Sequence, residues 1–262
     1  MTPSTSWHPR TYLSYADERS RPFHDLLTRV DAEAPRSVVD LGCGPGQLTA
    51  TLSHRWPQAR VLGLDSSPAM IEAAGAYASE RVRFGVADLR QFAAASGPAS
   101  VDVLVSNAAL QWVPDHRALL PRLVETVTPG GWFAFQVPGN FAEPSHRLLH
   151  ELAADPRFAA YTAGVERPAA WGPETYLGDL AAQDCTTDAW ETTYLHVLPG
   201  ADPVFTWISG TGARPVLQAL PDALRQVFVA EYKTALRTAY PPQPFGTVLP
   251  FRRVFVVARR SR

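Results

Sequence analysis

An acid followed by alternating glycines is the part of the chain best suited to hold a ligand. Residues 40–46 read Asp-Leu-Gly-Cys-Gly-Pro-Gly and follow the apolar pair Val38 and Val39. Glycine adopts positive φ and lets a ligand approach the main chain without a Cβ in between. The helix expected after the glycines would add free N–H groups and the positive end of its dipole. The pattern therefore predicts a ligand-binding strand–turn–helix.

The kind of ligand follows from two features of this turn. Dinucleotide-binding turns read G-x-G-x-x-G or end on alanine, whereas Gln47 stands at the corresponding place here. Asp40 would repel a pyrophosphate and attract an ammonium group. Asp-x-Gly-x-Gly-x-Gly resembles motif I of the S-adenosylmethionine (SAM) methyltransferases, whose cofactor carries an amino-acid end. Taken alone, the motif is also compatible with an ordinary tight turn.

Three further apolar runs read as strands that close on polar residues: Arg60–Asp65, 82–88 and Val101–Asn107. Asp65 lies 19 residues beyond Gly46, where an acid can accept both ribose hydroxyls of a nucleoside. Asp88 is a candidate acceptor for the adenine amino group. Met70 would pack either in the core or beside the adenine.

The order of elements predicts the fold that positions these groups. Strands and helices alternate from Ser37 to Val137, and two later strands are expected at 188–198 and 251–258. This order favours an α/β fold with a doubly wound, mostly parallel, seven-stranded, Rossmann-like sheet. In such sheets ligands bind beyond the carboxyl ends of the strands, where Asp65, Asp88 and Asn107 would lie.

Local signals set several boundaries. Pro22 is expected at the start of a helix, Ser67 and Pro68 at the start of another, and Asp115 as the cap of a third. Residues 128–131, Thr-Pro-Gly-Gly, are expected to form a turn.

The rest of the chain is expected to complete a single domain of 262 residues. Residues 1–34 form an arm and a helix, and 141–187 and 199–245 form helical cap segments over the active site. Two interpretations of the arm stay open. It packs loosely on the sheet, or it folds over the cofactor with aromatic and cationic groups such as Tyr15 and Arg21.

Composition excludes several classes of protein. The formal net charge is −1 and only 19% of residues are charged, so nothing indicates nucleic acid or an anionic membrane as a partner. No apolar run reaches the roughly 18 residues of a spanning helix. With only Cys43 and Cys185, we expect a reducing cytoplasm rather than a disulfide framework. No metal site is expected, and the oligomeric state is not readable.

Four elements together resemble the class I SAM-dependent methyltransferases over roughly the first 140 residues: 40–46, Asp65, Asp88 and the turn at 129–131. Five further stretches closely resemble the trans-aconitate 2-methyltransferase family and span the whole chain: 18–22, 65–71, 111–116, 211–215 and 253–260. The resemblance implies SAM as cofactor, S-adenosylhomocysteine as its product, and a monomethyl ester of trans-aconitate. It also implies cofactor-binding residues: Tyr15, Asp40, Gly42, Gly44, Gly46, Asp65, Ser66, Met70, Asp88, Leu89 and Asn107.

A carboxylate acceptor would simplify the chemistry. Carboxylic acids titrate near ~4, so the acceptor is already ionised near neutral pH and needs no general base. The protein then has to align the reactants and exclude water, and no catalytic residue is expected. Arginine binds carboxylates bidentately. The expected acceptor-binding residues are Arg21, Gln111, Trp112, Gln136, Tyr194, Trp207, Arg214, Tyr240 and Arg253. His116 is expected to be structural.

Two other functions stay open. The same fold could methylate another small molecule at oxygen or nitrogen, or could bind SAM without turnover. A nucleic-acid methyltransferase is disfavoured because 106–109 read Ser-Asn-Ala-Ala, not the Asn-Pro-Pro-aromatic sequence of enzymes that methylate a flipped base.

Overall fold

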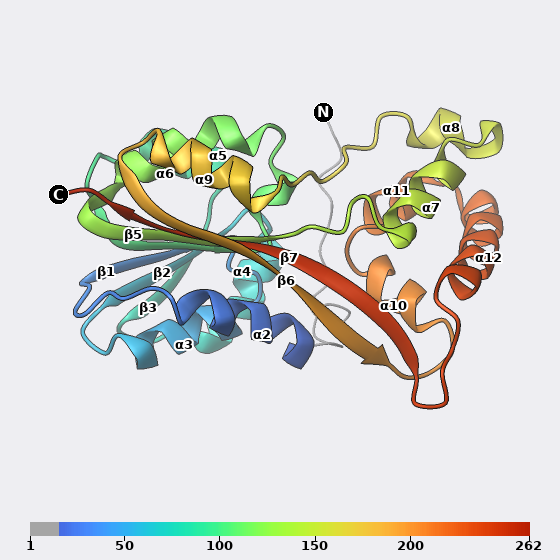
Figure 1. Cartoon of the computed structure of the whole chain (residues 1–262), viewed down its shortest axis with the longest axis horizontal. Coiled ribbons are helices and arrows are strands. Elements are labelled where there is room, and N and C mark those ends of the chain that lie inside the picture. Colours follow the sequence, from blue (N-terminus) through green and yellow to red (C-terminus); the bar gives the residue numbers. More distant parts are fainter. Residues whose placement is uncertain (1–15) are drawn as a thin grey trace. The chain divides into compact units, whose positions relative to one another are not determined.

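The computed structural model describes residues 16–262, with side chains from Ser20 onward, and divides into two compact units (Figure 1). The first unit comprises residues 16–137 together with 171–192 and 254–262. The second comprises 138–170 and 193–253. Of the expected cap segments, 199–245 lies wholly in the second unit, whereas 141–187 is divided between the two.

A seven-stranded sheet with the order β3-β2-β1-β4-β5-β7-β6 organises the fold. The ladders that β1 forms with β2 and β4, β2 with β3, and β4 with β5 are all parallel. The doubly wound, mostly parallel sheet predicted from the sequence is therefore confirmed. The strands are β1 Ser37–Leu41, β2 Arg60–Asp65, β3 Val82–Val86, β4 Val101–Asn107, β5 Val127–Pro138, β6 Cys185–Leu198 and β7 Thr247–Arg260.

Helices cover both faces of the sheet in the first unit. Figure 1 shows α5, α6 and α9 on one face and α2 and α3 on the other. The helices of this unit are α2 Ala16–Leu27, α3 Gln47–Arg55, α4 Pro68–Ala74, α5 Leu89–Ala95, α6 Leu120–Thr126 and α9 Pro173–Ala181, with short 3-10 turns at Gly75–Tyr77, Leu110–Trp112 and His116–Leu119. The central strands β1 and β4 are almost wholly buried because helices pack on both sides.

Several boundary predictions are corrected. Pro22 lies inside α2 rather than at its start. Asp115 precedes a 3-10 turn with φ 51° and makes no side-chain capping bond. Residues 128–131 belong to β5, which continues past Gly130 at φ 79° and pairs with β4 through a register shift. By contrast, the Ser67 hydroxyl accepts from Met70 N at 3.4 Å, and Pro68 begins α4 as predicted.

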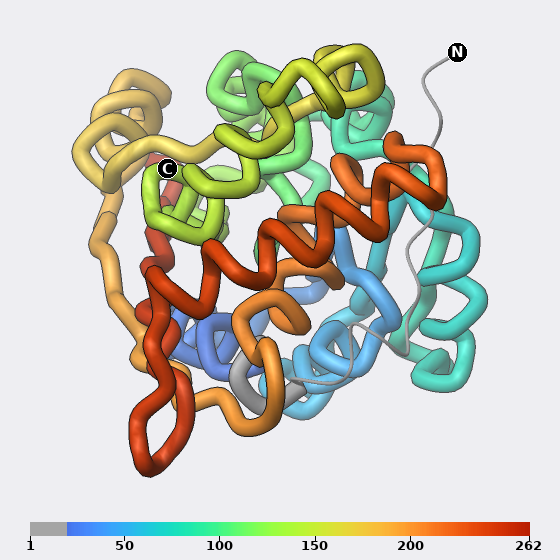
Figure 2. Tube along the Cα trace, turned by 90° about the vertical axis from the view of Figure 1, so that its right-hand side faces the viewer, coloured from blue at the N-terminus to red at the C-terminus, as the bar shows by residue number. Residues whose placement is uncertain are grey.

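The second unit is helical. Its helices are α7 Pro144–Ala153, α8 Pro156–Thr162, α10 Pro203–Ser209, α11 Arg214–Ala219 and α12 Asp222–Ala239. The long α12, orange-red in Figure 2, packs against α7 and α10. Its buried face carries Phe228, Tyr232 and Leu236.

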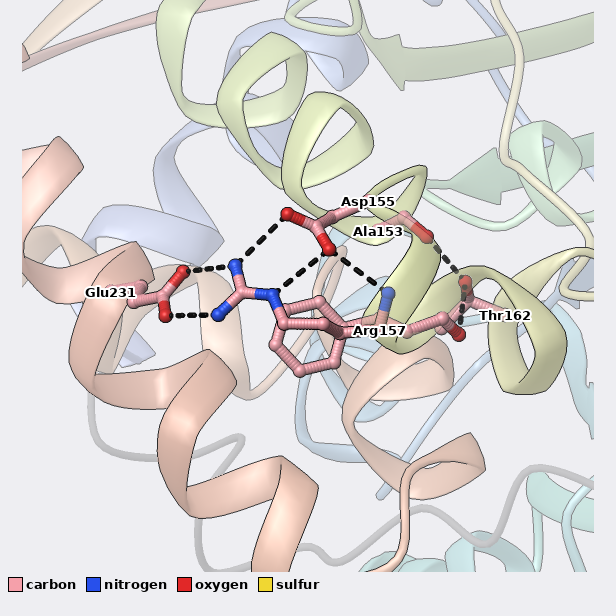
Figure 3. A network of polar contacts seen from close by, with 6 residues as sticks. Ala153, Asp155, Arg157, Thr162 and Glu231 are labelled. Atoms are coloured by element: carbon pink, nitrogen blue, oxygen red, sulfur yellow. Dashed lines mark hydrogen bonds and ion pairs between the residues drawn. The ribbon is translucent and has the colours of Figure 1, made fainter.

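A surface ion-pair network ties α8 to α12 within this unit (Figure 3). Both terminal guanidinium nitrogens of Arg157 donate to Glu231, at 2.7 and 2.9 Å. Its Nε and backbone N also donate to Asp155, which caps α8. Phe158 meets Phe228 edge to face beside this network, with centroids 5.1 Å apart. Exposed ion pairs contribute little by themselves, so the aromatic contact is the stronger link.

Candidate cofactor and acceptor sites

The glycine turn joins β1 to α3 in a conformation that only glycine adopts easily. Gly42, Gly44 and Gly46 have φ of 77°, 55° and 84°. The turn is tied to β2 because Gly42 N and Cys43 N both donate to the carbonyl of Leu64, at 2.7 and 3.0 Å. A Cβ built on Gly44 would meet no atom within 4 Å, so the turn has an open backbone at its centre.

The turn forms one side of a cleft in the first unit. The lining residues come from β1, the turn, the start of α3, α2 and the end of β4: Phe23, Asp40, Gly42, Cys43, Gly44, Pro45, Gln47, Leu48 and Asn107. Phe23 was not among the residues expected at the site. Its helical spacing with Leu26, Leu27 and Val30 indicates a core position, and the side chain is indeed fully buried.

Asp40 is a buried acid in this cleft with one unused acceptor. Its Oδ2 accepts from the Thr49 hydroxyl at 2.6 Å, and its Oδ1 has no hydrogen-bond partner among the described residues. Burial raises the pKa of Asp40 to about 7; the Thr49 bond opposes this rise and the charge of Asp65 adds to it. A buried carboxylate with an unused acceptor oxygen has the chemistry to bind a cationic amino group.

Two backbone amides donate hydrogen bonds to the carboxylate of Asp65. Its Oδ2 accepts from Gly44 N at 3.0 Å and its Oδ1 from Ser67 N at 2.9 Å. Burial raises the pKa of Asp65, while these two bonds oppose the rise. Each carboxylate oxygen has a second lone pair, so the side chain is oriented and can still accept from a ligand hydroxyl.

Asp88 lies beyond β3 and caps α5. Its Oδ1 accepts from Arg90 N at 2.8 Å, and Gln91 completes a capping box. An ion pair with the Arg90 side chain, at 3.1 Å, lowers the pKa of Asp88. Among the other expected cofactor residues, Met70 and Leu89 are buried and Ser66 is exposed. Tyr15 lies outside the described residues.

The ends of β4 and β5 bring an expected cofactor residue next to an expected acceptor residue. Asn107 is in register with Gln136, whose Nε2 donates to Asn107 Oδ1 at 2.6 Å. Gln111 follows on the 3-10 turn, donates to Ala108 O at 2.6 Å, and leaves its buried Oε1 without a partner among the described residues. Trp112 beside it is half-buried.

His116 is structural in its contacts, as expected. Its Nε2 lies 2.8 Å from the hydroxyl of Tyr176, which also accepts from Trp171 N at 3.2 Å. Both His116 and Tyr176 are fully buried. Burial lowers the pKa of His116, which favours the neutral imidazole in this hydrogen bond.

The remaining expected acceptor residues differ in burial. Arg214 and Arg253 of the second unit are only 8% and 5% exposed. Burial lowers the pKa of Arg214, and the Arg253 guanidinium lies 4.6 Å from the centre of the Phe251 ring. In the first unit, the side chain of Arg21 is 70% exposed and lies 3.8 Å from Asp25.

Aromatic acceptor candidates of the second unit cluster around one histidine. Tyr194 and Trp207 both stack on His196, with ring centroids 6.2 and 4.6 Å from it. The hydroxyl of Tyr240 accepts from Ser145 N at 3.1 Å, which gives this tyrosine a structural contact.

The sequence of α7 contains His146-Arg-Leu-Leu-His150. Two histidines four residues apart on one helix have a spacing found in metal sites. In the part of the chain that the structure describes, no group of three or more His, Cys, Asp or Glu could hold an ion. Residues 16–262 also contain no helix with the length and hydropathy needed to cross a membrane.

Comparison with known proteins places the fold. Residues 38–131 match the family model described as a methyltransferase domain. The YcgJ protein of Bacillus subtilis is similar in structure, with a TM-score of 0.60 at 13% identity, covering 92% of this chain and 99% of that one. Geranyl diphosphate C-methyltransferase of Streptomyces coelicolor, solved with S-adenosyl-L-homocysteine, has a TM-score of 0.56 at 16% identity, covering 96% and 82%. The sheet order, the glycine turn and the family model define a class I SAM-dependent methyltransferase.

Curated relatives narrow the class. A trans-aconitate 2-methyltransferase of Streptomyces avermitilis is 51% identical over 266 residues, covering 98% of this chain and 97% of the relative. One of Methylobacterium nodulans is 47% identical and covers 98% and 99%. The chain belongs to the trans-aconitate 2-methyltransferase family, and its cofactor is SAM.

Proposed function

We propose that this enzyme transfers a methyl group from SAM to one carboxylate of trans-aconitate, giving a monomethyl ester and S-adenosylhomocysteine. Full-length similarity to the family carries the proposal. The buried Asp40 beside an open glycine turn supports the cofactor half. Two nearly buried arginines, Arg214 and Arg253, support an anionic acceptor.

Residues of the first unit would hold the cofactor. When bound, SAM supplies an electrophilic methyl group on a sulfonium. Asp40 Oδ1 binds the amino group, the backbone around Gly44 allows close approach, and Asp65 accepts the ribose hydroxyls. Asn107 stands at the end of β4 with its amide fixed by Gln136. Ser66, Met70, Asp88 and Leu89, at the ends of β2 and β3, are proposed for the adenosine side.

Cationic and amide side chains would together bind the acceptor. Arg214 and Arg253 bind carboxylates through their forks and keep them ionised at neutral pH, so no protein base has to remove a proton. Gln111 and Gln136 offer amide groups, and Trp112, Tyr194 and Trp207 offer apolar walls. Arg21 is the weakest of the three proposed arginines because its side chain is mostly exposed and near Asp25. Tyr240 is proposed to offer a further apolar wall for the acceptor.

Partners and location are proposed on coarser grounds. With a net charge of −1, a small-molecule carboxylate is a better partner than nucleic acid or an anionic membrane. Cys43 and Cys185 are both free, which suits the reducing cytoplasm.

A methyl-transfer assay tests the proposal. Purified enzyme with methyl-labelled SAM is given trans-aconitate, its cis isomer and a panel of di- and tricarboxylates, and the product is tested for the base lability of an ester. We expect ester formation with trans-aconitate and, at saturating SAM, a rate that is flat above about pH 5.5, because carboxylates stay ionised there. Absence of ester with every polycarboxylate, or a rate that rises near neutrality with another acceptor, would contradict it.

A further inference from the structure

His146 is a buried histidine that no step proposed above uses. It lies in the first turn of α7 and is only 4% exposed. Its Nδ1 is 3.3 Å from the hydroxyl of Ser145, and the ring of Phe141 meets it edge to face with centroids 5.3 Å apart. Both neighbours belong to the second unit, so the imidazole is fixed within that unit.

Two tyrosines bond to the backbone beside His146: Tyr232 of α12, and Tyr240 directly after that helix. The Tyr232 hydroxyl donates to Ser145 O at 2.7 Å, and Ser145 N donates to the Tyr240 hydroxyl at 3.1 Å. Ser145 is 2% exposed and Tyr232 fully buried. Two tyrosines thus fix both polar groups of one peptide residue, which leaves the neighbouring imidazole little freedom to move.

On its other side the imidazole faces Gly212. A Cβ built on Gly212 would lie 2.8 Å from His146 Nε2 and 3.3 Å from its Cδ2. The φ of Gly212 is not in the left-handed region, so the glycine is required by space rather than by backbone conformation. The backbone at residue 212 therefore rests against the edge of the histidine ring.

Gly212 belongs to the short connection that leads into Arg214. Ala213 N donates to Ile208 O at 3.0 Å, and Arg214 N donates to Thr211 O at 3.1 Å. These bonds make residues 210–214 a compact turn between α10 and α11. A shift at Gly212 is transmitted to Arg214 because only one residue separates them.

We propose that His146 is a positioning residue for acceptor binding: its ring supports the backbone of Gly212 and thereby fixes the buried side chain of Arg214. This inference depends on the proposed role of Arg214 in binding a carboxylate. It assigns His146 a steric role, in which the bulk of the ring matters and its protonation chemistry does not.

The test is a set of variants assayed for the KM of trans-aconitate and the KM of SAM separately. His146→Ala removes the support, and we expect the acceptor KM to rise roughly tenfold or more, because small displacements of a positioning group have large effects. His146→Gln keeps most of the bulk and should retain a nearly normal acceptor KM. In every case the SAM KM should change less than about twofold, because the turn positions Arg214, which is proposed to bind the acceptor and not SAM.

Gly212→Ala provides the reciprocal test. Its methyl group would collide with the imidazole, so the acceptor KM should rise, and combining it with His146→Ala should restore part of the loss because the space is vacated. His150→Ala on the same helix is the matched control and should have no effect on either KM. Thermal unfolding of each variant separates loss of fold from loss of acceptor binding.

The outcomes distinguish the two proposals. If Arg214→Ala leaves the acceptor KM unchanged, Arg214 does not bind the acceptor, and both its proposed role and the positioning role of His146 are wrong, while methyl transfer to trans-aconitate is unaffected. If Arg214→Ala raises it while His146→Ala and Gly212→Ala only lower the melting temperature, the positioning role alone is wrong. Failure of the double variant to recover any acceptor affinity would also overturn it.

Discussion

Gly42 and Ala109 lie so close that a Cβ built on the glycine would be 2.1 Å from the alanine Cβ. The turn after β1 and the segment after β4 are thus in direct contact in the first unit. The first carries the proposed cofactor residues and the second leads to Gln111 and Trp112. The space proposed for the cofactor therefore depends on glycine at position 42, because a side chain there would collide with Ala109.

Replacing Gly42 by alanine should therefore damage SAM binding. The added methyl group collides with Ala109 and also forces alanine to φ 77°, which together should cost about 2–4 kcal/mol of stability. Calorimetric titration with SAM and urea unfolding measure the two effects. Gly178→Ala in α9 is the control, because its Cβ would meet nothing within 4 Å. Normal affinity and stability in Gly42→Ala would contradict the expected collision.

We expect Asp40 to bind the cofactor and, because it is buried, to lower the free energy of unfolding as pH rises. Its pKa is raised to about 7, so the folded protein binds more protons than the unfolded chain between about pH 4 and 7. Stability therefore falls as pH rises through this range, by on the order of a few kcal/mol. Asp40→Asn should remove this pH dependence, and be more stable than the natural protein at pH 8, while binding SAM at least tenfold more weakly.

The natural protein provides a second readout of the same effect. An amino group beside Asp40 favours its ionised form, so SAM affinity should increase from pH 6 to pH 7 and binding should release protons. Calorimetry in buffers of different ionisation enthalpy measures that release. Proton uptake, or an Asp40→Asn variant with normal affinity, would refute this role for Asp40.

Tyr176→Phe should destabilise the first unit. The change removes the hydroxyl that bonds to His116 Nε2 and accepts from Trp171 N, at an expected loss of about 1–3 kcal/mol. Denaturant unfolding measures it. Tyr161→Phe is the matched control, because that side chain is 48% exposed and should change stability by less than about 0.5 kcal/mol. Equal effects of the two variants would show that the His116–Tyr176 bond contributes nothing.

Acid should destabilise the second unit through His146. Burial lowers its pKa to about 4, and the nearby His150 contributes to this. The unfolded chain takes up a proton near pH 6.5, so stability is lost progressively as pH falls from about 6.5 to 4. The loss is on the order of a few kcal/mol. In His146→Gln the slope of unfolding free energy against pH should decrease by up to one proton; an unchanged slope would show that His146 is not buried in its neutral form.

Some of the site was readable from the chain because it depends on local chemistry. The alternating glycines, and the acids Asp40 and Asp65 at strand ends, carry their own backbone and charge requirements, so they predict a ligand-binding site at this end of the sheet. Alternation of short apolar runs with helical periods likewise predicted the order of strands. Two boundaries differ from the prediction: Pro22 lies within α2, and β5 continues through Gly130, where its pairing with β4 shifts register.

Only the tertiary structure decided which residues lie together. Phe23 lines the cleft although its spacing is that of any core residue. Gln136 is fixed to Asn107 from the neighbouring strand. His146 contacts Gly212, which lies 66 residues away in sequence: a Cβ built on the glycine would be 2.8 Å from the imidazole. The physical reason is the distance in sequence over which each property is determined. Backbone conformation and charge at a turn depend on a few adjacent residues, whereas burial and side-chain contacts arise only after the whole chain has packed.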